Sequence, residues 1–360
     1  MSAPAEGGLR RFSLAIDAMG GDHAPEAVLD GLEIAAERHP GARFLLVGDE
    51  ARLTPLLATR PRAAKACALR HAPDTIPGDM KPTLALRQGR NSSMRLAIDA
   101  VAGGEAAGVV SAGNTGALMA LAKIVVKTMP EIGRPALAAI APSARGDVVM
   151  LDLGANVQCD ARNLVEFAIM GDAFARAVLG LPAPSIGLLN VGSEELKGDD
   201  RVREAAEVLR APGAGLNFHG FVEGHDITAG TVDVVVTDGF TGNVALKTGE
   251  GALKLMRDLL RQVFTSSVPA RLGYLLARPA LERLREWMDP RRYNGAILLG
   301  LNGVVVKSHG GTDATGFAHA VDVAMDMVTH GFTQNIRESL SRLAAPAPQL
   351  AAPQPAASQG

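Results

Sequence analysis

Three short turns rich in glycine, asparagine and threonine hold the residues best suited to chemistry. Each follows an apolar run and precedes a helical pattern, and they cover residues 111–116, 152–156 and 238–243. N–H groups in the first turn of a helix lack intrahelical partners and lie at the positive end of the helix dipole, so such turns often bind anions. An ordinary capped turn is an equally good interpretation of each. Because the three would meet at the carboxyl edge of a parallel sheet, we expect a binding site there.

The side chains of these turns can donate hydrogen bonds to an oxyanion. Glycine lets a ligand approach the backbone closely, and asparagine and threonine supply polar hydrogens. The candidates in the first turn are Gly113, Asn114, Thr115 and Gly116, and those in the other two are Asn156, Asp238 and Asn243.

Cationic and titratable side chains lie close to glycine in two further places. Lys307 ends an apolar strand pattern, and His309 follows it beside two glycines. His309 is a candidate site residue, although a structural histidine fits the pattern as well. Lys197 lies in a charged loop after another strand pattern, where it could reach a phosphate. An equally good alternative is that this loop only provides the N-terminal cap of the next helix.

Arginines gather on a predicted helical region at residues 82–102. Arg87, Arg90 and Arg95 lie within it. A solvated basic face is the commoner outcome of such a pattern. The functional alternative is a docking surface for an acidic partner or an anionic ligand, formed by Arg87 and Arg95.

Residues 266–292 depart from the rest of the chain. Apolar residues recur there at spacings of three and four among arginines, and Pro279 is expected to divide the segment into two short helices. Such an amphipathic pair suits an anionic membrane surface. Packing against a second copy of the chain is the alternative, and it is the more frequent fate of an apolar stripe.

Short apolar runs alternate with longer helical patterns, which predicts βαβ units and an α/β fold with a mainly parallel sheet covered on both faces. We expect one continuous body over residues 12–344, with disordered tails at 1–11 and 345–360. The predicted strands are Ser13–Asp17, Phe44–Val47, Ala68–His71, Ala107–Val110, Ala136–Ala141, Val148–Leu153, Ile186–Val191, Val232–Thr237 and Val304–Lys307. The predicted helices include Glu26–Arg38, Pro82–Ala102, Asn114–Lys127, Ala161–Leu179, Asp199–Arg210, Asn243–Phe264 and Thr312–Leu343.

Composition excludes several classes of protein. A formal net charge of −2 over 360 residues gives no support to bulk nucleic-acid binding. Two cysteines form neither a disulfide framework nor a metal cluster, and they fit a reducing cytoplasm. No apolar run approaches the ~18 residues of a membrane span. The glycines near the N-terminus do not form the dinucleotide fingerprint, so nicotinamide binding is not expected.

Nine segments in a fixed order together resemble the PlsX family, the fatty acyl-(acyl carrier protein):phosphate acyltransferases of bacterial phospholipid synthesis. The resemblance runs from about Phe12 to Ala344, with small departures at Met80 and at residues 193–196 that bear on partner docking. The matching segments are Ile16–Pro25 (IDAMGGDHAP), Lys81–Met94 (KPTLALRQGRNSSM), Ser111–Met119 (SAGNTGALM), Arg134–Ala138 (RPALA), Leu151–Asn156 (LDLGAN), Leu188–Gly198 (LLNVGSEELKG), Asp238–Lys247 (DGFTGNVALK), Gly300–Gly303 (GLNG) and Lys307–Gly310 (KSHG).

The resemblance implies a fold like that of phosphotransacetylases and isopropylmalate dehydrogenases, in a cytoplasmic homodimer held peripherally at the membrane. It implies transfer of a long acyl chain from acyl carrier protein to inorganic phosphate, with no cofactor and no metal. The acyl phosphate would then feed a membrane glycerol-3-phosphate acyltransferase. The helices of residues 266–292 are the expected membrane contact.

That reaction can be matched to the residues. Phosphate is already an anionic nucleophile near neutral pH, and a thiol of pKa ~8.5 leaves readily. The site must therefore position phosphate and stabilise the oxyanion. Neither Cys67 nor Cys159 lies in a nucleophile-like turn beside a histidine, so a covalent acyl-enzyme is disfavoured.

Roles follow from this chemistry as hypotheses. We expect the 113–116 turn and Arg134 to hold phosphate, and Asn156, Asn243 and the 239–242 backbone to face the thioester. Asp238 or His309 would accept a proton or orient phosphate, and Lys307 would supply positive charge. Two rivals remain: an enzyme that uses coenzyme A thioesters, and a non-catalytic scaffold at a lipid interface.

Overall fold

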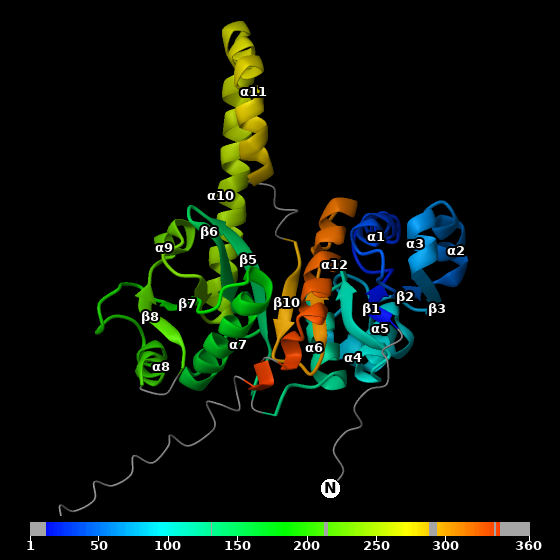
Figure 1. Ribbon diagram of the computed structural model, residues 1–360, viewed down its shortest axis with the longest axis horizontal. Helices are drawn as coiled ribbons and strands as arrows, with labels where there is room; N and C mark the ends of the chain where they lie inside the picture. Colours follow the sequence, from blue (N-terminus) through cyan, green and yellow to red (C-terminus); the bar gives the residue numbers. More distant parts are fainter. Residues whose placement is uncertain (1–11, 131, 212–214, 288–293, 335, 339–360) are drawn as a thin grey trace, which may run out of the picture.

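One eleven-stranded sheet organises the molecule, in the order β3-β2-β1-β4-β11-β10-β5-β6-β9-β7-β8 (Figure 1). The computed structural model describes residues 12–130, 132–211, 215–287, 294–334 and 336–338. The expected tails lie outside these residues. The strands are β1 Phe12–Asp17, β2 Phe44–Gly48, β3 Cys67–His71, β4 Ala106–Ser111, β5 Ala136–Ser143, β6 Gly146–Leu151, β7 Ser185–Leu189, β8 Asn217–Val222, β9 Val234–Val236, β10 Ala296–Leu299 and β11 Val304–Lys307.

Helices cover both faces of this sheet, as the alternating pattern predicts. Alternate residues of a strand point to opposite faces: Val110 belongs to the core on the face covered by α1, α7, α8 and α12, whereas Val109 belongs to the core on the face covered by α5, α6, α9 and the start of α10. The helices are α1 Glu26–Arg38, α2 Glu50–Ala58, α3 Pro61–Ala66, α4 Pro82–Gln88, the 3₁₀ turn η1 Gly89–Asn91, α5 Ser93–Ala102, α6 Thr115–Val125, α7 Ala161–Leu179, α8 Asp200–Arg210, α9 Gly224–Ala229, α10 Gly239–Thr265, α11 Val268–Trp287 and α12 Ala314–Thr329.

The sheet is mainly parallel, but its two halves run in opposite directions. Three successive antiparallel pairings, β11–β10, β10–β5 and β5–β6, lie between β4 and β6, while β6 and β9 are parallel to each other. The expectation that all three glycine turns leave one carboxyl edge is therefore wrong. The turn after β4 leaves the sheet in one direction, and the turns after β6 and β9 leave it in the other. Composition and periodicity carry no information about the direction of the short strand β10.

The register shows how far apart these turns begin. A single rung of the sheet connects Val110, Val306, Ile297, Ala138 and Leu151. The ends of β4 and β6 are thus level, and four strand spacings, about 19 Å in all, separate them. The polar turns form two groups on either side of β11, β10 and β5.

Several predicted elements differ in detail. The helix expected over residues 82–102 is broken, because the Ser92 hydroxyl accepts the Arg95 N–H at 3.2 Å and donates to the Gly89 carbonyl at 2.6 Å, which ends one helix and caps the next. Strands β8 and β10 were not predicted: β8 begins with polar residues and contains a glycine, and β10 has only four residues. The helix expected over 312–343 is interrupted: α12 ends at Thr329, and helical residues resume at 332–334 and 336–338. The short helices α2, α3 and α9 were also missed.

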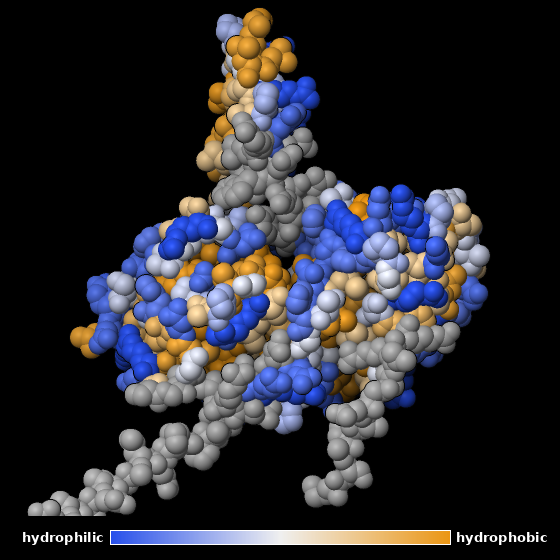
Figure 2. Space-filling view, viewed as in Figure 1, coloured by the Kyte–Doolittle hydropathy of each residue, from blue (hydrophilic) through white to orange (hydrophobic). Residues whose placement is uncertain are grey.

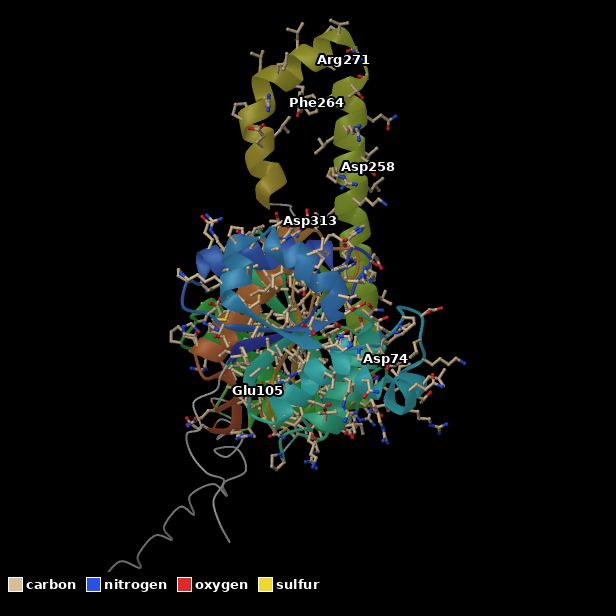
Figure 3. All side chains as sticks on the ribbon, turned by 90° about the vertical axis from the view of Figure 1, so that its right-hand side faces the viewer. Asp74, Glu105, Asp258, Phe264, Arg271 and Asp313 are labelled. Carbon is tan, nitrogen blue, oxygen red and sulfur yellow. The ribbon has the colours of Figure 1, made fainter. Side chains whose placement is uncertain are left out.

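Helices α10 and α11 form an antiparallel pair that projects from the body, here called the arm (Figures 1 and 3). The expected break at Pro279 is wrong, because Pro279 lies inside α11. The chain turns at Ser266–Ser267 instead, where hydroxyl groups satisfy the helix ends: Ser266 donates to the Val263 carbonyl at 2.7 Å, and Ser267 accepts the Ala270 N–H at 3.2 Å. The side chains of residues 283–287 and all of 288–293 lie outside the description.

Apolar side chains of the arm are exposed. They gather at its tip and along one side (Figure 2). None of the described helices has the length and apolarity that a membrane crossing requires. The exposed apolar residues of the arm are Leu253, Leu255, Met256, Leu259, Val263, Val268, Leu272, Tyr274, Leu275 and Leu276.

Candidate functional site

The turn between β4 and α6 is held rigidly by Asn114. Its amide oxygen accepts the Ala117 N–H at 3.0 Å and so caps α6, while its amide nitrogen donates to the carbonyls of Gly78 and Met80, both at 2.8 Å. These bonds tie the 77–80 loop to the turn. They give Asn114 a structural role beside the predicted contact with phosphate.

Glycine at positions 113 and 20 allows two turns to touch. A Cβ on Gly113 would lie 2.6 Å from the Met94 methyl group, and a Cβ on Gly20 would lie 2.6 Å from the Gly113 nitrogen. Thr115 is exposed at the first position of α6, and Gly116 packs on Pro82. The backbone N–H groups of the turn are therefore accessible only over a small, closely packed surface.

Asp17, at the end of β1, lies beneath this turn and is buried. Its carboxylate accepts the hydroxyls of Ser93 and Ser111, both at 2.6 Å, and Ser111 in turn accepts the Gly113 N–H at 3.1 Å. Burial raises the pKa of Asp17, and these hydrogen bonds oppose that rise. Sequence analysis did not select Asp17; its place at a strand end before a double glycine was the available signal.

Lys307 and His309 join the same group. The buried Lys307 ammonium lies 3.3 Å from the Ala112 carbonyl and also donates to the Ser308 carbonyl. Burial lowers the pKa of Lys307 to about 8. His309 is exposed; its backbone N–H donates to Asn294 at 2.8 Å, and its Nδ1 accepts the Gly311 N–H at 3.1 Å. We call this set the lysine group: residues 17–22, 111–116 and 307–311.

The second and third turns form another group around Asp152. This buried carboxylate accepts the N–H of Leu137 at 2.9 Å, of Ala155 at 3.0 Å and of Asn156 at 2.6 Å. Burial raises the pKa of Asp152, and the hydrogen bonds oppose the rise. The Asn156 amide also donates to the Pro135 carbonyl at 2.7 Å. Asp152 begins the second of the three turns but was not predicted as a site residue.

Two arginines and the start of α10 complete this second group. Asp238 caps α10 by accepting the Thr241 N–H at 2.9 Å. Arg134 donates to the Gln158 carbonyl at 3.0 Å, and Arg201 donates to the Cys159 carbonyl at 2.9 Å. We call this set the arginine group: residues 134–137, 152–159, 201 and 238–243. Arg201 was missed by sequence analysis, which treated its segment only as a charged loop and helix.

Close backbone contacts hold the second and third turns together. The Gly239 N–H donates to the Asn156 carbonyl at 2.8 Å, and a Cβ on Gly242 would lie 1.9 Å from the Asp152 carbonyl oxygen. Asn243 is exposed and lies beside Gly154. Any side chain at position 242 would therefore displace α10 from the body.

The structure brings some predicted residues together and separates others. We expected Arg134 to bind phosphate together with the Gly113 turn. Instead Arg134 lies next to Asn156, just before the start of β5. Lys197 belongs to neither group; it is exposed and forms an ion pair with Glu194 at 2.9 Å, whose hydrogen bond raises the pKa of Lys197. Its predicted contact with phosphate stays a prediction.

Neither thiol is activated. Burial raises the pKa of Cys67 to about 12 and that of Cys159 to about 11. Because the thiolate is the nucleophilic form, both side chains are unreactive near neutral pH.

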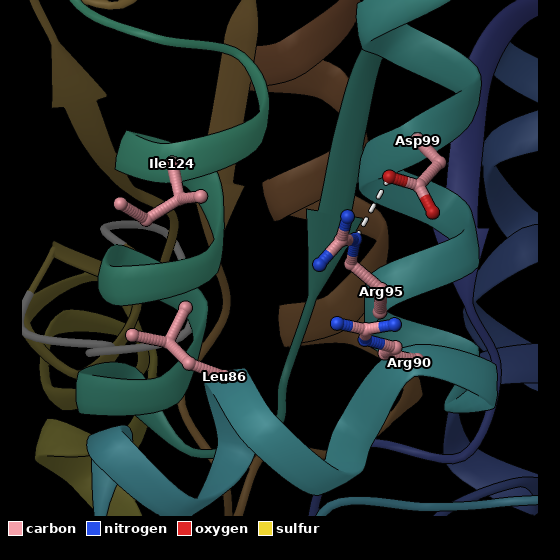
Figure 4. A pocket seen from close by; sticks show the side chains of 5 residues that line it. All are labelled: Leu86, Arg90, Arg95, Asp99 and Ile124. Carbon is pink, nitrogen blue, oxygen red and sulfur yellow. Dashed lines mark hydrogen bonds and ion pairs between the residues drawn. The ribbon is translucent and has the colours of Figure 1, made fainter.

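A pocket of ≈560 Å³ lies away from both groups, between α4, α5 and α6 (Figure 4). Leu86 and Ile124 form one side, and Arg90 and Arg95 form the other. Arg95 is fixed by Asp99, with 2.8 Å between Nε and Oδ1. Arg87 is exposed on α4 but does not line this pocket.

Comparison with solved structures supports the fold. The chain is similar to a phosphotransacetylase from Streptococcus pyogenes, with a TM-score of 0.59 and 18% identity over 89% of this chain and 95% of that one. It is also similar to the EutD phosphotransacetylase from Staphylococcus aureus, with a TM-score of 0.57 and 16% identity over 88% and 93%. At these identities the likeness confirms the predicted fold class and nothing more.

Comparison with sequences identifies the family. Residues 12–335 match the family described as fatty acid synthesis protein. A protein of Gluconacetobacter diazotrophicus named phosphate acyltransferase is 72% identical over 336 residues, which cover 93% of this chain and 90% of that protein. Another of the same name, from Granulibacter bethesdensis, is 72% identical over 92% and 90%. The chain therefore belongs to the fatty acid synthesis protein family, the PlsX family of phosphate acyltransferases, and is an acyltransferase.

Proposed function

We propose that this acyltransferase forms acyl phosphate by direct attack of inorganic phosphate on the thioester of a long-chain acyl-(acyl carrier protein), to supply phospholipid synthesis. A phosphate oxygen forms a bond to the acyl carbon, the carbon–sulfur bond breaks, and the carrier thiolate takes up a proton. The chief support is that each group contains polar donors and a cation while both thiols have raised pKa values. Such a site suits positioning better than covalent catalysis.

In this proposal the lysine group binds phosphate. The Lys307 ammonium has three N–H donors, and the carbonyls of Ala112 and Ser308 take two of them. The third can reach an anion beside the backbone N–H groups of Asn114 to Gly116 at the start of α6. His309, exposed at the edge of the group, orients phosphate or accepts its proton.

The arginine group faces the thioester. Arg134 and the first N–H groups of α10 offer positive charge to the carbonyl oxygen as it becomes an oxyanion. Asn243 contributes an exposed amide. Asn156, whose amide nitrogen donates to the Pro135 carbonyl and the Asp152 carboxylate, lines the site and fixes the turn, and Asp238, which caps α10, is the alternative proton acceptor. Direct attack requires the phosphate oxygen and the acyl carbon to lie about 3–3.5 Å apart, so both reactants must meet in the space between the two groups, whose nearest strands, β11 and β5, are two strand spacings, about 10 Å, apart.

The carrier protein docks at the pocket between α4 and α6. The basic side of the pocket, formed by Arg90 and Arg95, complements an acidic helix of the carrier protein. The apolar side of the pocket can receive an apolar side chain of that protein. Arg87 adds charge at the rim. Nine residues of α6 separate Ile124 from Thr115, a rise of about 14 Å, which a flexible prosthetic arm can span.

The arm carries the proposed homodimer and membrane contacts. Its exposed leucine, valine and methionine side chains form an apolar surface that a second copy or a lipid interface would cover. Proximity to the membrane would bring the acyl phosphate to a membrane glycerol-3-phosphate acyltransferase. Co-sedimentation with anionic vesicles, compared between the native chain and a Leu275→Glu, Leu276→Glu variant, tests the lipid contact.

The proposed reaction is tested by mass spectrometry of acyl phosphate formed from palmitoyl-(acyl carrier protein) and inorganic phosphate by the purified protein. Product that depends on phosphate supports the proposal. No product from a folded protein would contradict it. The same assay with palmitoyl-coenzyme A decides between the carrier protein and coenzyme A as the thiol.

A further inference from the structure

Asp17 has no role in the chemistry above, yet its carboxylate is the most heavily bonded group beneath the Gly113 turn. It is 1% exposed and joins three separate segments: β1, the start of α5 through Ser93, and the end of β4 through Ser111. Its Oδ1 also accepts the Met19 N–H at 3.3 Å. Burial of a carboxylate costs folding free energy, which the hydrogen bonds to Asp17 offset. A residue held at such a cost is a candidate for a role in the site.

The register places Asp17 beside Lys307. Asp17 pairs with Ser111, and Ser111 pairs with Lys307, so the three residues occupy one rung of neighbouring parallel strands. Two strand spacings separate the outer residues, about 10 Å between backbones. Paired residues of parallel strands point to the same face, so both charged side chains approach the Ser111–Gly113 segment from its two sides.

Each charged side chain fixes a different part of that segment. Asp17 orients the Ser111 hydroxyl, which accepts the Gly113 N–H. Lys307 donates to the carbonyl of Ala112, the residue between them. We propose that Asp17 is a positioning residue that keeps the Lys307 ammonium charged and in place for phosphate, a role that rests on the function proposed above.

Two carboxylates act on the Lys307 ammonium: Asp17 lies on β1, and Asp22 lies in the loop after β1. His309 is the other titratable side chain of the lysine group and follows β11 itself. Asp17 and Asp22 both raise the pKa of Lys307 against the larger effect of burial, which lowers it to about 8. Asp22 is exposed and its effect is screened by water, whereas Asp17 is buried. The effect of Asp17 should therefore be the larger.

The sign of the pH effect follows. The ammonium is charged below its pKa and neutral above it, so phosphate binding weakens as pH rises through about 8. Removal of the Asp17 charge lowers the pKa of Lys307. The alkaline limb of kcat/KM for phosphate should then move to lower pH, because the loss of an opposite charge disfavours the ammonium form.

The test measures kcat/KM for phosphate against pH in the full chain and in Asp17→Asn, with saturating palmitoyl-(acyl carrier protein). Asp22→Asn should move the limb in the same direction but by less. Ser93→Ala is the matched control, because it removes one hydrogen bond to Asp17 and leaves the charge. If Asp17→Asn does not fold, Asp17→Ser, which can still accept from Ser111, replaces it.

A limb displaced in the Asp17 variant and unmoved in Ser93→Ala supports the proposal. A uniform fall of kcat/KM with the limb unmoved overturns it, since a merely structural carboxylate gives that result. Failure of the proposed function is distinct, because the unmodified chain would then form no acyl phosphate at any pH.

Discussion

In the proposed reaction the lysine group and the arginine group both hold anionic oxygen, but they do so with different side chains. The cation of the lysine group is buried, and its pKa is about 8. The cations of the arginine group are exposed or half-buried guanidinium groups, which stay charged throughout the working range. Burial thus makes one half of the site sensitive to pH, while the other half keeps constant charge. This difference can be tested by removing the cation of each group in turn.

Removal of the buried cation should have the largest effect. Lys307→Ala deletes the ammonium that we place against phosphate, so kcat/KM for phosphate should fall by about 10²–10³, the usual loss on removing one preorganised donor. Steady-state kinetics with varied phosphate measures it. The alkaline limb should disappear with the lysine; a limb that persists would show that another group titrates.

Removal of the exposed cation should have a smaller effect that does not depend on pH. Arg134→Ala should lower kcat/KM for the acyl thioester by about 10- to 100-fold, as expected for a charged hydrogen bond. Arg145→Ala, at an exposed position on the β5–β6 hairpin, is the matched control. If Arg134→Ala raised only the KM for phosphate, Arg134 would belong to the phosphate site, as the sequence analysis expected.

Close packing in the arginine group should contribute to the free energy of unfolding. Gly242→Ala places a methyl group on the Asp152 carbonyl, so the free energy of unfolding should fall by about 1–3 kcal/mol. Gly249→Ala, on the same helix with open space at its Cβ position, should be neutral or stabilising. Thermal unfolding of both variants measures this. Equal melting temperatures would mean that α10 does not depend on this contact.

The proposed dock lies outside both groups and should have the smallest effect. Arg90→Glu should raise the KM for acyl-(acyl carrier protein) severalfold at low salt and leave the KM for acyl-coenzyme A unchanged, because rim charges mainly change association. Arg257→Glu on the arm is the control. An equal rise for both thioesters would place Arg90 in the active site instead.

Periodicity predicted most of the fold. Helices Glu26–Arg38 and Ala161–Leu179 begin and end where they were expected, because each is long and amphipathic with clear ends. What could not be predicted depends on long-range pairing. The reversal of the sheet at β10 is set by a four-residue strand. The arm turns at Ser266 and Ser267, whose hydroxyl groups satisfy the helix ends, and not at Pro279, which lies inside α11.

Only part of the arrangement of the candidate site could be predicted, for the same reason. Glycine turns and Lys307 stand out in the sequence because their residue types are unusual at strand ends. Asp17 and Arg201 act through partners far along the chain, Ser111 and Cys159, and no local pattern reveals such contacts. The division into two groups likewise required the register of the whole sheet.

The most direct test of the account is a single turnover of palmitoyl-(acyl carrier protein) on stoichiometric enzyme without phosphate, followed by intact-mass analysis of the protein. Direct attack by phosphate predicts no acylated enzyme and no release of carrier protein until phosphate is added, when acyl phosphate and free carrier appear together. Release of carrier with an acyl group retained on the protein would contradict it.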